Sequence, residues 1–143
     1  MSDHPIVYLF VHAVWSVKQR EPLLAKPVRR VLFAHMQKDA AEKGIRVVAV
    51  NGVEDHIHCV VQLMPSQNLI QVIRSLKTDS SRWLNENKLL SGPFEWEEGY
   101  FAYSISPSGL KQVSDYVDKQ EEYHKTKTLE NEWEAFERLK DSL

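Results

Sequence analysis

The chain has 143 residues, 43% of them hydrophobic, and this is enough for the core of one globular domain, which we expect to span residues 1–143. The single cysteine, Cys59, excludes an internal disulfide, and neither a run of about 18 apolar residues nor a leader-like segment occurs, so we expect a soluble, cytoplasmic protein with no membrane partner. The net charge of −2 argues against a uniformly basic nucleic-acid binder, but the charge is polarised, with +4 over residues 1–50 and −6 over residues 93–143.

The first elements can be read from hydrophobic periodicity. Residues 6–15 form a β-branched and aromatic run that is apolar on both alternating faces, which is typical of a central strand covered on both sides. Residues 27–43 favour a helix, because an apolar stripe recurs at helical spacing, Pro27 suits the first turn and Gly44 suits the end.

The rest of the chain alternates between the same two patterns. They predict strands at 45–53, 56–64 and about 94–105, and helices at 69–87, 109–124 and 129–139. The order β-α-β-β-α-β with appended helices predicts an α+β, ferredoxin-like (split β-α-β) antiparallel sheet. We expect the two connecting helices on one face and the helix at 109–124 on the other.

Two histidines stand one residue apart on the third predicted strand. Because strand side chains alternate, His56 and His58 should share one face, whereas Ile57 and Cys59 should face the connecting helices. Two imidazoles at this spacing on a rigid strand can both reach one divalent ion. The same pattern also arises by chance between core histidines, so spacing alone leaves both interpretations open.

The helix predicted at 109–124 presents further polar groups. Tyr116, Gln120 and His124 are spaced four residues apart and should share one helix face. Gln120 offers a neutral metal ligand, and Tyr116 offers a hydroxyl capable of nucleophilic attack. The alternative is that Tyr116 is a half-buried core tyrosine.

Taken together, five segments resemble, in order, the motifs of one known family. They read HAVWSVKQR (12–20), DHIHCVV (55–61), SLKTDSSR (75–82), GYFAYSIS (99–106) and YVDKQEEYH (116–124). These motifs are similar to those of the single-tyrosine HUH transposases of small bacterial insertion sequences, the IS200-like family, which includes the REP-associated tyrosine transposases. HUH denotes His, a hydrophobic residue and His, here His56-Ile57-His58. Tyr123 stands where the family often has the first of two histidines.

The resemblance implies a mechanism and partners. It implies that His56, His58 and Gln120 bind Mg²⁺ or Mn²⁺, and that Tyr116 attacks single-stranded DNA with hairpin ends. The product would be a 5′-phosphotyrosine intermediate that a later 3′-OH resolves, so that strands are cut and rejoined by transesterification. It further implies a homodimer, in which the tyrosine helix of one subunit can complete the metal site of the other.

Basic residues supply the expected DNA contacts. Lys18 and Arg20 follow the first strand, and Arg74, Lys77 and Arg82 recur along the second helix. Phosphate contacts of this kind make affinity strongly dependent on salt. For each of these residues, a solvated helix or loop surface is the alternative.

Three other functions are compatible with the same residues. One is a non-covalent metal phosphodiesterase in which Tyr116 is only structural. A second is an HUH nuclease retained by its host to act on repeated hairpin DNA. A third is a catalytically silent, ferredoxin-like nucleic-acid binder.

Overall fold

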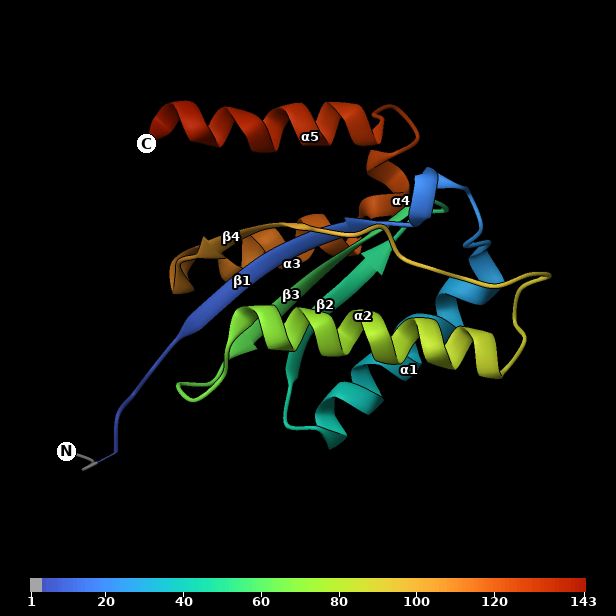
Figure 1. Cartoon of the computed structure of the whole chain (residues 1–143). Helices are drawn as coiled ribbons and strands as arrows, with labels where there is room; N and C mark the ends of the chain where they lie inside the picture. Colours follow the sequence, from blue (N-terminus) through green and yellow to red (C-terminus); the bar gives the residue numbers. More distant parts are fainter. Residues whose placement is uncertain (1–3) are drawn as a thin grey trace.

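The fold is built on a four-stranded antiparallel sheet. The computed structural model describes residues 4–143, and its strands are β1 (Leu9–Ser16), β2 (Arg46–Gly52), β3 (His56–Leu63) and β4 (Phe101–Ile105). They lie in the order β2-β3-β1-β4, with the largely buried strands β1 and β3 in the centre (Figure 1). This arrangement confirms the α+β, ferredoxin-like prediction.

The helices divide between the two faces of the sheet. The two connecting helices, α1 (Lys26–Glu42) and α2 (Leu69–Glu86), cover one face (Figure 1). On the other face lie α3 (Leu110–Asp118) and α5 (Leu129–Glu137), joined through the short α4 (Gln120–Tyr123). Short 3-10 helices occupy 18–20, 107–109 and 138–142. Within residues 4–143, no helix is both long and apolar enough to span a membrane.

Strand alternation sends the apolar side chains of the central strands toward α1 and α2. Ala13, Trp15, Ile57, Cys59 and Val61 are all buried there and pack against apolar residues of both helices. A smaller apolar cluster on the opposite face contains Phe10, Ala49, Val60, Ile105 and Val117. Because most of the apolar core lies under α1 and α2, the opposite face can hold buried polar groups without dividing that core.

The fourth strand is shorter than its sequence suggests. Regular pairing covers only Phe101–Ile105, and residues 94–100 contribute a single bridge, between Trp96 and Val17. Gly99 has a positive φ of 79°, which interrupts the extended backbone. Upstream, the Asn85 side chain hydrogen-bonds to both the N–H and the carbonyl of Phe94. These backbone groups are therefore satisfied by a side chain and not by pairing with a neighbouring strand.

The helix predicted at 109–124 is broken. α3 ends at Asp118, Lys119 adopts φ −102° and ψ 22°, and α4 begins at Gln120. The Asn51 side chain on β2 donates to the Asp118 carbonyl at 2.9 Å, which satisfies a backbone acceptor at the helix end. The break therefore lies at a contact with the sheet that periodicity does not report.

Candidate functional site

Strand β3 carries His56 and His58 on the face opposite α1 and α2. Both side chains are completely buried, and their ring centroids lie 5.2 Å apart. Tyr116 of α3 and Phe136 of α5 make ring contacts with His58, so the two helices cover the histidine face. The two histidines therefore share one face, as strand alternation predicts, but inside a covered site.

Two side chains from the C-terminal part of the chain complete a polar cluster around these histidines. His124 follows α4, and Glu132 lies on α5 with none of its surface exposed. One ligand atom from each of His56, His58, His124 and Glu132 falls within 4.8 Å of all the others. Three imidazole nitrogens and a carboxylate at this separation can coordinate a single divalent ion.

Glu132 lies at the centre of the cluster. Its carboxylate is 2.9 Å from His56 Nε2, 3.1 Å from His58 Nε2 and 2.6 Å from His124 Nε2. Burial alone would raise the pKa of Glu132, but the hydrogen bonds with the three histidines outweigh burial and lower that pKa well below its usual range. The carboxylate is therefore ionised and acts as the common acceptor for the imidazoles.

Acceptors on the outer side of the cluster orient two of the rings. His56 Nδ1 lies 2.8 Å from Asp55, which also pairs with Arg20 at 3.5 Å, and His124 Nδ1 lies 2.8 Å from the Lys127 carbonyl. Burial lowers the pKa of His56, but Asp55 and Glu132 more than compensate and raise it overall. Because a carboxylate and a carbonyl accept hydrogen bonds, both rings carry a proton on Nδ1 and direct Nε2 inward.

The third ring, His58, has a different outer partner. Its Nδ1 lies 2.9 Å from Nε2 of His12, a fully buried residue of β1. His12 Nδ1 in turn lies 3.0 Å from the hydroxyl of Tyr103, its cross-strand neighbour on β4. Burial lowers the pKa of His58 to about 4 and, together with the charge of His58, that of His12 to about 3. Both rings are therefore neutral near pH 7.

Tyr116 directs its hydroxyl into the same cluster. The hydroxyl donates a hydrogen bond to Glu132, and the Tyr116 ring centroid is 5.6 Å from that of His58. Burial, and after it the Glu132 carboxylate, raises the pKa of Tyr116 well above its ordinary value, so the phenol is protonated. One chain thus brings the tyrosine and the histidine pair together.

Gln120 is fully buried at the start of α4. Its Nε2 donates a long hydrogen bond of 3.4 Å to the Tyr116 carbonyl, and its Oε1 has no hydrogen-bond partner among residues 4–143. A buried amide oxygen without a partner is unfavourable unless a ligand satisfies it. The residues present therefore fit a bound cation.

His124 and Glu132 are not among the metal ligands predicted from the sequence. His124 shares the four-residue spacing of Tyr116 and Gln120, so a signal for it was present. The signal for Glu132 is weaker. It is the acidic member of a stripe at helical spacing with Leu129, Trp133 and Phe136, where an apolar residue would be expected.

We expect Glu132→Ala to destabilise the metal-free protein by about 3 kcal/mol, because the buried imidazoles and the Tyr116 hydroxyl lose their common acceptor. Urea unfolding in the presence of a chelator measures this change. Glu134→Ala, an exposed glutamate on the same helix, is the matched control and should change stability by less than about 1 kcal/mol. Equal effects of the two substitutions would contradict the central position of Glu132.

The five basic residues predicted to contact DNA differ in their partners within the chain. Arg20 lies near the histidine cluster, paired with Asp55 and Glu130. Arg82 pairs with Asp79 within α2 at 3.7 Å. Arg74, also on α2, is exposed and makes no ion pair within the described residues 4–143.

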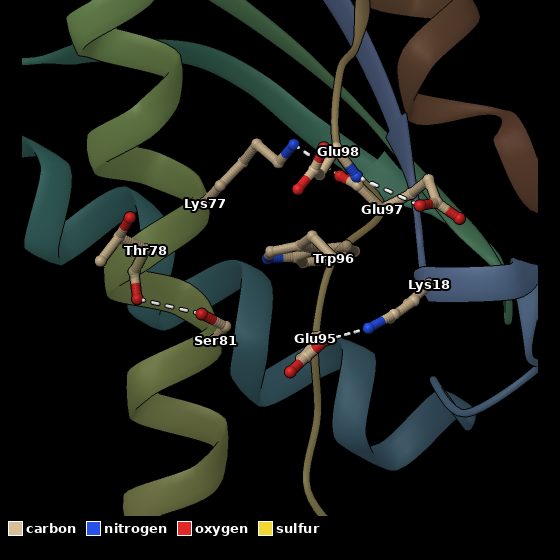
Figure 2. A pocket seen from close by; sticks show the side chains of 8 residues that line it. All are labelled: Lys18, Lys77, Thr78, Ser81, Glu95, Trp96, Glu97 and Glu98. Carbon is tan, nitrogen blue, oxygen red and sulfur yellow. Dashed lines mark hydrogen bonds and ion pairs between the residues drawn. The ribbon is translucent and has the colours of Figure 1, made fainter.

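The other two basic residues, Lys18 and Lys77, line one pocket of about 360 Å³ between α2 and residues 95–98 (Figure 2). Lys18 pairs with Glu95 at 2.7 Å, and Lys77 donates to the carbonyls of Glu97 and Gly99. Lys77 thereby fastens the irregular segment before β4 to α2. The Lys77 ammonium group is therefore engaged by backbone carbonyls of the protein itself.

Comparison with known proteins identifies relatives of the chain. Residues 6–120 match the family model described as "Transposase IS200 like". The ISDra2 transposase TnpA of Deinococcus radiodurans is 26% identical over 121 residues, which cover 80% of this chain and 86% of the relative. The transposase for insertion sequence element IS200 of Salmonella typhimurium is 26% identical over 120 residues, covering 80% and 78%.

Solved structures share the fold. A putative transposase from Deinococcus radiodurans superimposes with a TM-score of 0.66 at 22% identity, covering 84% of this chain and 96% of that one. A REP-associated tyrosine transposase bound to a REP hairpin superimposes with a TM-score of 0.62 at 15% identity, covering 87% and 74%. Because the family model extends over most of its length, the chain belongs to the IS200-like transposase family, a family of enzymes that cut and transfer DNA strands.

Proposed function

We propose that this transposase cleaves and rejoins single-stranded DNA by metal-assisted transesterification, with Tyr116 as the nucleophile. The observation that carries the proposal is the position of the Tyr116 hydroxyl, which donates to Glu132 beside His56 and His58. A residue acting only in the core would not need a hydroxyl directed at a cluster of metal-binding groups.

Metal binding is assigned to His56, His58 and Gln120, with His124 and Glu132 close enough to contribute. Bound there, Mg²⁺ or Mn²⁺ would polarise the scissile phosphate and stabilise the charge that develops on it. Imidazole ligands suit Mn²⁺ better than Mg²⁺. The partnerless Gln120 Oε1 supports this assignment, because coordination satisfies a buried acceptor.

The chain's own residues govern the nucleophile. The Tyr116 phenol holds its proton in the resting site, and its hydrogen-bond acceptor, Glu132, is placed to take that proton during attack. The phenol oxygen then bonds to phosphorus, the bond to the 3′-oxygen breaks, and that oxygen takes up the proton that Tyr116 released, leaving a 5′-phosphotyrosine and a free 3′-OH. Attack by another 3′-OH reverses these steps and releases Tyr116, so the strand is rejoined without an external energy source.

Single-stranded DNA with hairpin ends is the proposed substrate, supported by the structural relative that is bound to a REP hairpin. The test is incubation with such DNA and Mn²⁺, followed by denaturing electrophoresis. We expect a protein–DNA adduct that a chelator abolishes. Metal-dependent cleavage without an adduct would indicate a non-covalent phosphodiesterase instead. Hairpin binding that is indifferent to chelator and unaccompanied by cleavage would indicate a silent binder.

We expect Gln120→Ala to shift the metal dependence of cleavage to higher concentration, by about tenfold, because the site loses a neutral oxygen ligand. A titration of adduct formation against Mn²⁺ measures the shift. Gln112→Ala, an exposed glutamine on α3, is the matched control and should leave the titration unchanged. An unshifted titration in Gln120→Ala would remove Gln120 from the ligand set.

Arg74 is the strongest of the proposed DNA contacts, because its exposed guanidinium is not engaged by an acidic residue in the described part of the chain. We expect Arg74→Ala to weaken hairpin binding and to reduce the slope of log affinity against log salt by about 0.7 to 1. Fluorescence anisotropy at several salt concentrations measures both. Lys140→Ala near the C-terminus is the control, and an unchanged slope in Arg74→Ala would argue against a phosphate contact.

The homodimer implied by the family resemblance stays a prediction. The contacts of Tyr116 with Glu132 and His58 within one chain support an arrangement without an exchange of helices. We therefore propose a site completed in cis.

A further inference from the structure

The three histidines of the cluster differ in what lies behind them. Asp55 and the Lys127 carbonyl, behind His56 and His124, act as acceptors and keep a proton on Nδ1 of each ring. Behind His58 stands another imidazole, His12, which can either donate or accept. The outer partners of His56 and His124 determine which nitrogen carries the proton. The outer partner of His58 does not, because His12 can take either role.

The resting hydrogen bonds assign one tautomer to this pair. With one proton on each ring, the Glu132 carboxylate at 3.1 Å accepts from His58 Nε2–H, and the lone pair of His58 is on Nδ1. His12 must then donate from Nε2 to that lone pair, and its own Nδ1 accepts from the Tyr103 hydroxyl. In this arrangement His58 presents an N–H to the cluster, and an N–H cannot bind a cation.

Binding a cation requires the opposite arrangement. With the Nε2 lone pair of His58 facing the ion, the Nε2 proton passes to solvent, and His58 Nδ1 takes the proton that His12 Nε2 held and donates it back to that nitrogen. His12 Nδ1 takes the Tyr103 hydroxyl proton and donates to the Tyr103 oxygen, which regains a proton from solvent and directs its O–H to another acceptor. Each ring keeps one proton throughout, so both rings change tautomer without a change in charge.

We propose that His12, anchored by Tyr103, is the positioning residue that makes His58 a metal ligand by allowing both rings to switch tautomer together. The inference rests on the proposed metal site. Its geometry is built into the sheet, because His12 and Tyr103 are paired across β1 and β4, and His58 lies diagonally across β1 and β3. All three groups are therefore held by strands and not by loops.

The first test is the affinity of the full chain for Mn²⁺ without DNA, measured from the electron paramagnetic resonance signal of free Mn²⁺. We expect His12→Phe to weaken binding by about 10- to 100-fold, because the ring keeps its bulk but cannot accept from His58. His12→Gln places an amide oxygen near the position of Nε2 and should stay within about threefold of the wild type. Equal losses in both variants, or no loss in His12→Phe, would overturn the proposal.

Tyr103→Phe removes the hydroxyl that contacts His12 Nδ1 and leaves the packing around His12 unchanged. We expect about a threefold loss of Mn²⁺ affinity, whereas Tyr100→Phe, which removes a hydroxyl on the α2 side of the sheet, should have no effect. Urea unfolding of each variant shows that the fold is kept. Identical affinities of the two tyrosine variants would overturn the role of Tyr103.

Ring ¹⁵N NMR supplies a readout that packing alone would not change. We expect His58 to carry its proton on Nε2 without metal and on Nδ1 when Zn²⁺, a diamagnetic ion with affinity for imidazole, is bound. A His58 ring that has its proton on Nδ1 in both states would overturn the switch. A wild-type chain that binds no Mn²⁺ would instead refute the proposed metal site itself, so the two failures are distinguishable.

Discussion

Tyr116→Phe is expected to eliminate the covalent protein–DNA adduct, a loss of at least about a thousandfold, whereas Tyr123→Phe retains it. The Tyr116 hydroxyl donates to Glu132 at the cluster, while Tyr123 follows the break at Lys119 and stands on the short helix α4. The ring centroids of the two tyrosines are 5.3 Å apart, so proximity alone does not choose between them. The two tyrosines are distinguished by the direction of the Tyr116 hydroxyl, which points to Glu132.

Denaturing electrophoresis of labelled single-stranded DNA measures the adduct, and Tyr123→Phe serves as the matched control. An adduct that survives in Tyr116→Phe and vanishes in Tyr123→Phe would reverse the assignment. Mixing Tyr116→Phe with His58→Ala adds a test of the site in cis. Two chains that each lack one component should not restore the adduct, and restoration would show that the tyrosine acts in the site of another subunit.

His58→Ala is expected to abolish metal-dependent cleavage, again by about a thousandfold or more, because the site loses an inward-facing imidazole. His56→Ala should behave in the same way. We expect the variants to remain folded, since the larger core under α1 and α2 does not include either ring. The lost contacts to Glu132 should lower stability by about 1 to 3 kcal/mol.

Activity and urea unfolding must be measured together for these variants. His35→Ala provides the control, because His35 stacks on Trp83, with ring centroids 4.2 Å apart, away from the cluster. It should retain cleavage. Loss of cooperative unfolding in His58→Ala, or full activity in a folded variant, would indicate that the pair are core histidines and not ligands.

Local pattern was sufficient for much of the architecture. Alternation on β3 separates His56 and His58 from Ile57 and Cys59, and helical periodicity locates α1 and α2 to within a residue or two. These features depend on residues that are close in the sequence. Apolar residues recur every two residues in a strand and every 3.6 residues in a helix, and this period indicates which face is buried. The ferredoxin-like order follows from the succession of such elements.

The chemistry of the site depends on contacts that no local period reports. His12 and Glu132 reach His58 from 46 and 74 residues away, and neither residue's own strand or helix pattern indicates that contact. The carbonyl at the break after Asp118 likewise accepts from Asn51, on strand β2. The sequence by itself determined the sheet, its covered face and the histidine pair. Only the tertiary structure decided which acceptors surround those histidines, because a buried polar group takes its partners from whatever the fold brings within hydrogen-bond distance.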